Sequence, residues 1–91
     1  MPKTLRTPRQ VRLIDLLVEQ RKRAGLSQAQ LAERLGRYQS VVSSMESGGR
    51  RVDVVELLDI AEVIGLDVHA LIDDLFATPK STSSALQSRK S

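Results

Sequence analysis

The residue types that most often carry out catalysis are scarce in this chain. His69 is the single histidine, and no second metal ligand lies three or four residues away from it. Asp73 and Asp74 are adjacent, so on a helix their side chains diverge by about 100°, which does not suit an acid–base pair. Gly48-Gly49 lacks the flanking residues of a phosphate-binding loop. We therefore expect no enzyme activity, no metal site and no cofactor.

The stretch RYQSVVSSMESGGRR, residues 37–51, carries polar chemistry of another kind. Its serines and glycines have low helix propensity. If the stretch is nevertheless helical, with about 100° of rotation per residue, Val41, Val42 and Met45 lie on one face and Glu46 lies at its border. Short side chains that can donate and accept hydrogen bonds occupy the rest: Gln39, Ser40, Ser43, Ser44 and Ser47. Such a low polar face permits close approach to base edges and phosphate oxygens, whereas a polar surface helix without a ligand is the alternative interpretation.

The charge of the chain is divided unevenly along its length. The net charge is +3, but residues 1–51 hold eleven Lys/Arg and four Asp/Glu, whereas residues 52–91 hold three Lys/Arg and seven Asp/Glu. This polarity favours a basic binding face backed by an acidic one, and two ordinary solvated surfaces are the alternative.

Cap residues and apolar periodicity predict five helices and no sheet. The second and third helices follow a helix-turn-helix plan, because Gln28 starts one helix, small Ala32 permits close packing, and Gly36 makes the turn. The expected helices span residues 8 to about 24, Ser27 to about Leu35, Gln39 to about Ser47, Asp53 to Gly65, and Asp67 to Phe76.

Composition limits where this domain acts and how it is organised. The chain has no cysteine, which excludes disulfides and thiolate metal sites, and no apolar run approaches the roughly 20 residues of a membrane span. The N-terminus also lacks the apolar core of a secretory signal, so we expect a cytoplasmic protein. We expect one domain at residues 8–77, after a flexible basic arm at 1–7 and before a disordered Ser-rich tail at 78–91.

The sequence resembles the Cro/repressor-like helix-turn-helix family, also called XRE-like. The stretches that carry the resemblance are RKRAGLSQAQLAERLG, QSVVSSMESGGRR and LLDIAEVIGLDVHAL, within about Leu13 to Leu71. The resemblance implies an all-α, compact five-helix, λ-repressor-like DNA-binding domain. It also implies a homodimer that binds double-stranded DNA at an inverted-repeat operator.

Roles follow from the matching positions of the family. Gln39, Ser40, Ser43 and Ser44 would face the major groove. Gln28 would anchor a phosphate at the second helix, and Arg37, Tyr38, Ser47, Arg50 and Arg51 would contact the DNA backbone. The resemblance further implies a pair between Arg21 and Glu46, which we interpret as structural; direct DNA contact by Arg21 is the alternative.

Two positions depart from the family pattern. Residue 37 is often apolar and residue 38 often Ser or Thr, whereas this chain has Arg37 and Tyr38. Tyr38 does not cap a helix as Ser or Thr does, and it can instead reach a phosphate or cover a thymine methyl group. No Arg or Lys lies between residues 39 and 47, so we expect Gln39 to read an adenine and DNA shape to contribute strongly.

The sequence therefore predicts a sequence-specific transcriptional regulator, most simply a repressor. The apolar fifth helix, with Ile72, Leu75 and Phe76, is the expected dimer surface, unless it only covers the core. Two other functions stay open: the antitoxin of a toxin–antitoxin pair, and a protein-binding adaptor that does not bind DNA.

Overall fold

The computed structural model describes residues 7–80, and this part of the chain consists of five α-helices with no strand. The helices are α1 (Pro8–Arg23), α2 (Gln28–Leu35), α3 (Gln39–Glu46), α4 (Val54–Ile64) and α5 (Val68–Ala77). The expected all-α, five-helix class is confirmed. Two helices end one residue earlier than expected, because Ala24 and Ser47 are the C-cap residues of α1 and α3.

Side-chain caps begin four of the five helices. Thr7 accepts a hydrogen bond from the backbone of Gln10, and Asp67 accepts one at the start of α5. At α2 and α4 the caps are reciprocal, since the third helical residue also accepts from the cap backbone. These local bonds satisfy helix N–H groups that have no partner within the helix. Because each cap joins residues only three positions apart, the helix starts could be predicted from the sequence.

The turn between α2 and α3 depends on a glycine. Gly36 lies in the left-handed region with φ of +71°, a conformation that a residue with a Cβ adopts only at a cost. Its N–H bonds to the carbonyl of Glu33, and the next N–H, of Arg37, bonds to the carbonyl of Ala32. The chain can therefore leave α2 and start α3 within three residues, which sets the angle of the helix-turn-helix.

The core lies behind α3. Val42 is fully buried and Met45 nearly so, and both pack into a cluster of aliphatic residues. The other buried members of the cluster are Leu17, Leu26, Leu31, Ala32, Leu57, Ile60, Ile64 and Leu71. Each large side chain buried in this way contributes about 1.5–3 kcal/mol, so packing rather than propensity holds the serine-rich helix in place.

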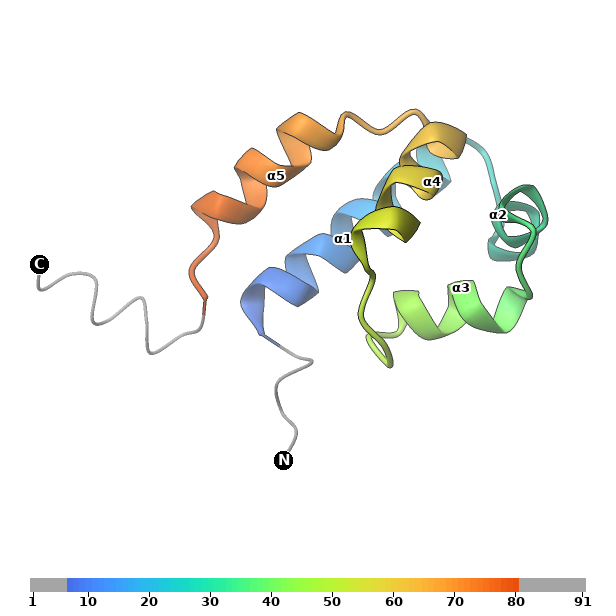
Figure 1. Ribbon diagram of the computed structural model, residues 1–91, viewed down its shortest axis with the longest axis horizontal. Coiled ribbons are helices and arrows are strands. Elements are labelled where there is room, and N and C mark those ends of the chain that lie inside the picture. Colours follow the sequence, from blue (N-terminus) through green and yellow to red (C-terminus); the bar gives the residue numbers. More distant parts are fainter. Residues whose placement is uncertain (1–6, 81–91) are drawn as a thin grey trace, which may run out of the picture.

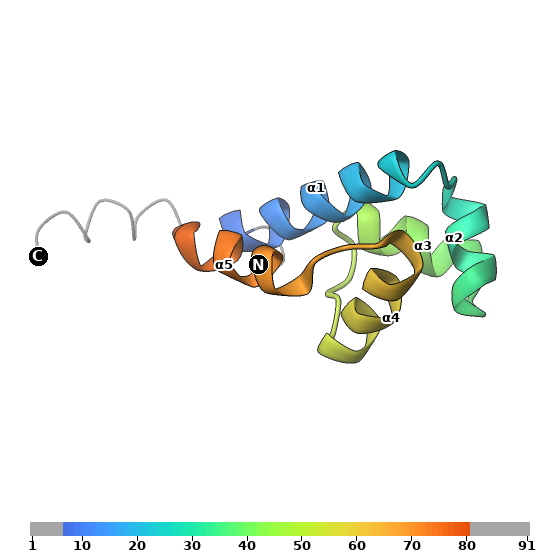
Figure 2. The same ribbon diagram turned by 90° about the horizontal axis from the view of Figure 1, so that it is seen from above.

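Figure 1 shows α2 and α3 at one end of α1, and α5 beside its other end. The view from above agrees, with α5 next to the N-terminal half of α1 (Figure 2). Within α5 only Leu71 is buried among the described residues. The fifth helix therefore contributes Leu71 to the core, with Val68 and Leu75 packed partly buried against it, and leaves the rest of its surface outside.

The expected arm and tail lie outside the described residues, except for Thr7 and residues 78–80. Over residues 7–80, no helix is both long enough and apolar enough to cross a membrane.

Candidate nucleic-acid interface

The polar face of α3 points away from the core. Gln39, Ser40 and Ser43 are exposed, whereas Ser44 is half-buried. Ser47 is exposed just beyond the helix, and its hydroxyl donates to the Ser44 carbonyl at 3.1 Å. The helix therefore presents short hydrogen-bonding side chains outward, as the helical periodicity predicts, and its larger apolar residues lie on the opposite side.

A buried ion pair holds α3 against α1. Arg21 donates two parallel hydrogen bonds to the Glu46 carboxylate, of 2.7 Å from Nε and 3.0 Å from Nη2. Its third nitrogen, Nη1, donates to the carbonyl of Leu26 at 2.7 Å. Because the two side chains are only 9% and 11% exposed, solvent screens the pair little. One guanidinium thus ties together α1, the turn before α2, and the end of α3.

Gln28 joins the same network. Its amide nitrogen donates to Oε1 of Glu46 at 2.8 Å. The sequence predicts that Gln28 anchors a phosphate, but in this structure its side chain links α2 to α3. The phosphate contact stays a prediction, and it requires either the backbone N–H at the start of α2 or an exchange of this hydrogen bond.

The two arginines on either side of α3 meet at one carboxylate. Arg50 Nη2 lies 2.9 Å from Oε2 of Glu56, and Arg37 Nη1 lies 3.5 Å from the same oxygen. Glu56 is the third residue of α4, where it also accepts from the backbone of Asp53 at 3.2 Å. The acid at the third helical position was visible in the sequence, but nothing local indicated its arginine partners.

The remaining predicted backbone contacts lie at the surface. Tyr38 is exposed and makes no side-chain cap on α3, in keeping with its departure from the family pattern. Arg51 is also exposed. The polar face of α3 and these two exposed side chains, which flank the helix in the sequence, offer hydrogen-bond donors, acceptors and positive charge, the chemistry that base edges and phosphates require.

Arg9, at the second position of α1, binds the C-terminal end of α5. Its Nε donates to the carbonyls of Leu75 at 3.0 Å and Thr78 at 2.9 Å, and its guanidinium lies 6.0 Å from the ring centroid of Phe76. Both carbonyls lie at the C-terminal end of α5, and that of Leu75 also accepts from the backbone N–H of Thr78 at 3.1 Å. The structure thus places the Arg9 guanidinium against the C-terminal end of α5.

The predicted dimer surface is accessible. Phe76 is 74% exposed and Ile72 is 39% exposed, whereas Leu75 is half-buried. With Arg9 these residues line a shallow hollow of about 150 Å³. Leu75 also packs against the core, whereas Ile72 and Phe76 do not belong to the core cluster, and the dimer surface stays a prediction.

The residues considered for catalysis lie on α5 without a catalytic arrangement. His69 is exposed, and Asp74 forms a two-pronged pair with Arg12, with bonds of 2.8 Å each. The hydrogen bond from Arg12, with its charge, holds the pKa of Asp74 below its usual value. Among residues 7–80 no group of three or more possible ligands is placed to hold a metal.

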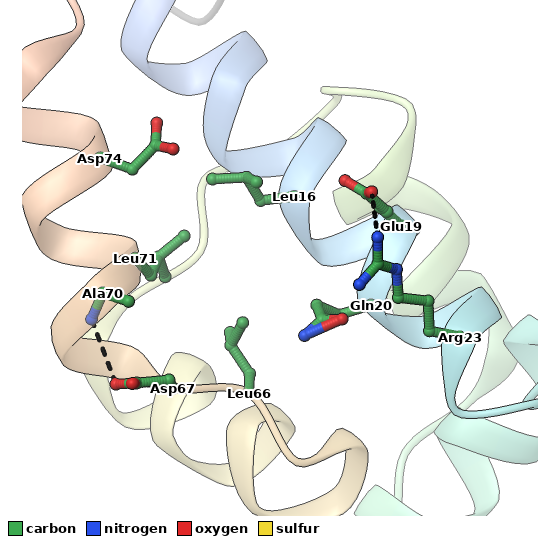
Figure 3. Close-up of a pocket in the computed structure, with 9 residues that line it drawn as sticks. All are labelled: Leu16, Glu19, Gln20, Arg23, Leu66, Asp67, Ala70, Leu71 and Asp74. Carbon is green, nitrogen blue, oxygen red and sulfur yellow. Dashed lines mark hydrogen bonds and ion pairs between the residues drawn. The ribbon is translucent and has the colours of Figure 1, made fainter.

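A cavity of about 250 Å³ lies between α1 and α5 (Figure 3). Its apolar lining comes from Leu16 on α1, Leu66 before α5, and Leu71 on α5. Two of the acidic residues at its edge are already engaged, since Glu19 pairs with Arg23, and Asp67 accepts from the Ala70 backbone. The cavity brings together no nucleophile and base, and none of the residues of the α3 surface line it.

Comparison with known proteins agrees with this geometry. Residues 12–75 match a family described as helix-turn-helix domain. The chain is also similar to a solved structure, an XRE-family like protein from Pseudomonas syringae pv. tomato str. DC3000, with 49% sequence identity and a TM-score of 0.71. That alignment covers 76% of this chain and 84% of the other. None of the curated proteins that were compared matches the chain.

Proposed function

The chain belongs to the XRE-like helix-turn-helix family of DNA-binding regulators, and from this premise we propose that it is a transcriptional repressor. In this proposal it binds an inverted-repeat operator in double-stranded DNA as a homodimer. The observation that carries the proposal is the division of α3, with Gln39, Ser40 and Ser43 exposed and Val42 and Met45 buried behind them.

The exposed face of α3 reads bases in the major groove. An α-helix fits this groove, and Gln39 at its first position is placed where recognition helices contact base edges. The glutamine amide can bond to N6 and N7 of adenine at once, whereas the hydroxyls of Ser40, Ser43 and Ser44 each donate and accept without strong base preference. The scarcity of long side chains on α3 supports close approach of the helix to the bases.

The residues that flank this face contact the DNA backbone. Tyr38 and Ser47 border α3 at its two ends, and Arg51 follows in the loop. Phosphate contacts of this kind fix the register of a protein on DNA and make its affinity depend on salt. Gln28, Arg37 and Arg50 complete the proposed set, although their side chains are held by Glu46 or Glu56 in the structure.

The proposed dimer forms through the apolar surface of α5. One copy of so small a domain presents few base contacts, and a two-fold dimer doubles them by placing its recognition helices about 34 Å apart, one turn of DNA. The exposure of Ile72 and Phe76 supports this surface. Arg9 and Arg12 support it further, because both fasten α5 to α1 and would keep the surface in place.

Selection of bound duplexes from a random pool tests the proposal. We expect enrichment of an inverted repeat with half-sites about one helical turn apart, and affinity for it that falls steeply as salt rises. A protein-binding adaptor would enrich no duplex, and that result would refute the proposal. Enrichment of a single half-site by a monomer would refute the dimer and leave DNA recognition standing.

A further inference from the structure

Glu56 connects both flanks of the recognition helix to a single point of the scaffold. Arg37 lies in the turn that precedes α3, and Arg50 lies in the loop that follows it. Both arginines approach the same oxygen, Oε2, of a side chain that is only 8% exposed. The other oxygen, Oε1, accepts from the Asp53 backbone, so the capping box of α4 fixes the carboxylate in position.

This connection matters because α3 is short and begins without a side-chain cap. It has eight residues, fewer than the roughly 12–15 that an isolated helix needs to be even marginally stable in water. It packs chiefly against α2 and α1. The two ion pairs at Glu56 add a link to α4 from the segment on each side of α3.

The two arginines are not held alike. Arg50 turns its guanidinium inward, because Nη2 bonds to Glu56 and Nη1 is buried without a hydrogen-bond partner among the described residues. Arg37 makes the longer contact and its side chain is 44% exposed, so part of it can still face DNA. The Arg50 side chain is 37% exposed, so the two arginines differ mainly in the length of their contact with Glu56 and in the buried Nη1 of Arg50.

We propose that Glu56 is a positioning residue for DNA recognition, which holds the turn before α3 and the loop after it in the arrangement that fits the groove. This inference rests on the proposed function and deepens it. It makes a prediction opposite to that of simple electrostatics. Loss of the negative charge makes the DNA-facing side more positive and favours binding to any duplex, whereas loss of positioning weakens binding to the operator alone.

Glu56→Gln separates these effects. Glutamine can still complete the capping box, because Gln30 does so at the same position of α2. The matched control is Glu62→Gln, which removes the same charge from an exposed position of the same helix. The full chain and both variants are titrated with the duplex enriched from a random pool and with a shuffled duplex of equal composition, under conditions where circular dichroism shows them folded.

We expect Glu56→Gln to lower the ratio of operator affinity to shuffled-duplex affinity by roughly tenfold, since two ordered side chains at the interface lose their anchor. Affinity for the shuffled duplex should stay level or rise. The Glu62→Gln control should keep the wild-type ratio. Glu56→Asp provides a second test, because it keeps the charge and a capping carboxylate but is one methylene shorter; it should also lower the ratio.

Other outcomes overturn the inference. If Glu56→Gln gained equal affinity for both duplexes, Glu56 would only weaken DNA binding through its negative charge. An unchanged ratio in both Glu56 variants would leave it a helix cap alone. If the wild-type chain showed no preference for any duplex, the proposed function would fail together with the inference. If the wild type discriminated and the Glu56 variants did so equally well, only the inference would fail.

Discussion

Replacement of Arg21 by methionine should destabilise the domain severely. Methionine favours a helix as well as arginine and has a similar length, so the change removes the charge and the hydrogen bonds but not the helix. Glu46 would then keep Gln28 as its remaining partner in the pair network, and the Leu26 carbonyl would lose its bond at 2.7 Å. The variant therefore leaves a buried carboxylate without the cation that compensates it.

The expected cost follows from burial. Both side chains are about one-tenth exposed, and removal of one partner from a buried pair costs about 3–5 kcal/mol. For a domain of this size, 1 kcal/mol lowers the melting temperature by about 4–8 °C, so a loss of at least about 12 °C is expected. The double variant Arg21→Met/Glu46→Leu should recover most of this loss, because apolar residues can replace a buried pair at little cost.

Thermal and urea unfolding followed by circular dichroism measure the effect. Arg23→Met is the matched control, because Arg23 lies on the same helix and its partner Glu19 is exposed. An exposed pair of this spacing contributes about 0.3–0.5 kcal/mol. If Arg21→Met unfolded within about 1 kcal/mol of the wild type, our account of the pair as the link between α1 and α3 would be wrong. Direct DNA contact by Arg21 would then become the better explanation.

Three further predictions concern the surfaces. Phe76→Glu should dissociate the dimer in sedimentation experiments, whereas Leu58→Glu, at a comparably apolar position on α4, should not; the reverse result would move the dimer surface to α4. Arg51→Ala should weaken binding to every duplex and reduce the slope of log affinity against log salt by about one, and an unchanged slope would remove it from the phosphate contacts. Because Arg12 lowers the pKa of Asp74, their pair stabilises the fold above the ordinary carboxyl pKa of about 3.9 and ceases to do so as the pH falls through the lower folded value. Asp74→Asn should therefore lose less stability than the wild type between about pH 5 and pH 2, and an identical pH profile would contradict this.

The helices were predictable because their signals are local. A serine, an aspartate or a threonine accepts from an N–H three residues away, and Gly36 adopts its positive φ through its own lack of a side chain. The two faces of α3 followed from its 3.6-residue period in the same way. The caps, the glycine turn and the helical faces depend only on residues close together in the sequence, so they could be predicted from it.

The partners of the long polar side chains were harder to predict from the sequence. The border positions of Arg21 and Glu46 on their helices agreed with a pair, but the family resemblance was needed to join them. Nothing in the sequence indicated that Glu56 would meet Arg50 or that Arg9 would reach the end of α5. Such contacts depend on how separate helices pack, and arginine can reach any of several carbonyls or carboxylates at nearly equal cost.

The most direct test of DNA reading by α3 compares the duplexes selected by the wild-type chain with those selected by Gln39→Ala. Gln39 is exposed and lies outside the core cluster, so its removal should leave the fold intact. We predict that the wild type selects an inverted repeat and that the variant loses preference at one base pair in each half-site. The loss should be about 1–3 kcal/mol for the preferred base. An unchanged selected sequence, or an equal loss of affinity for every duplex, would contradict base reading by α3.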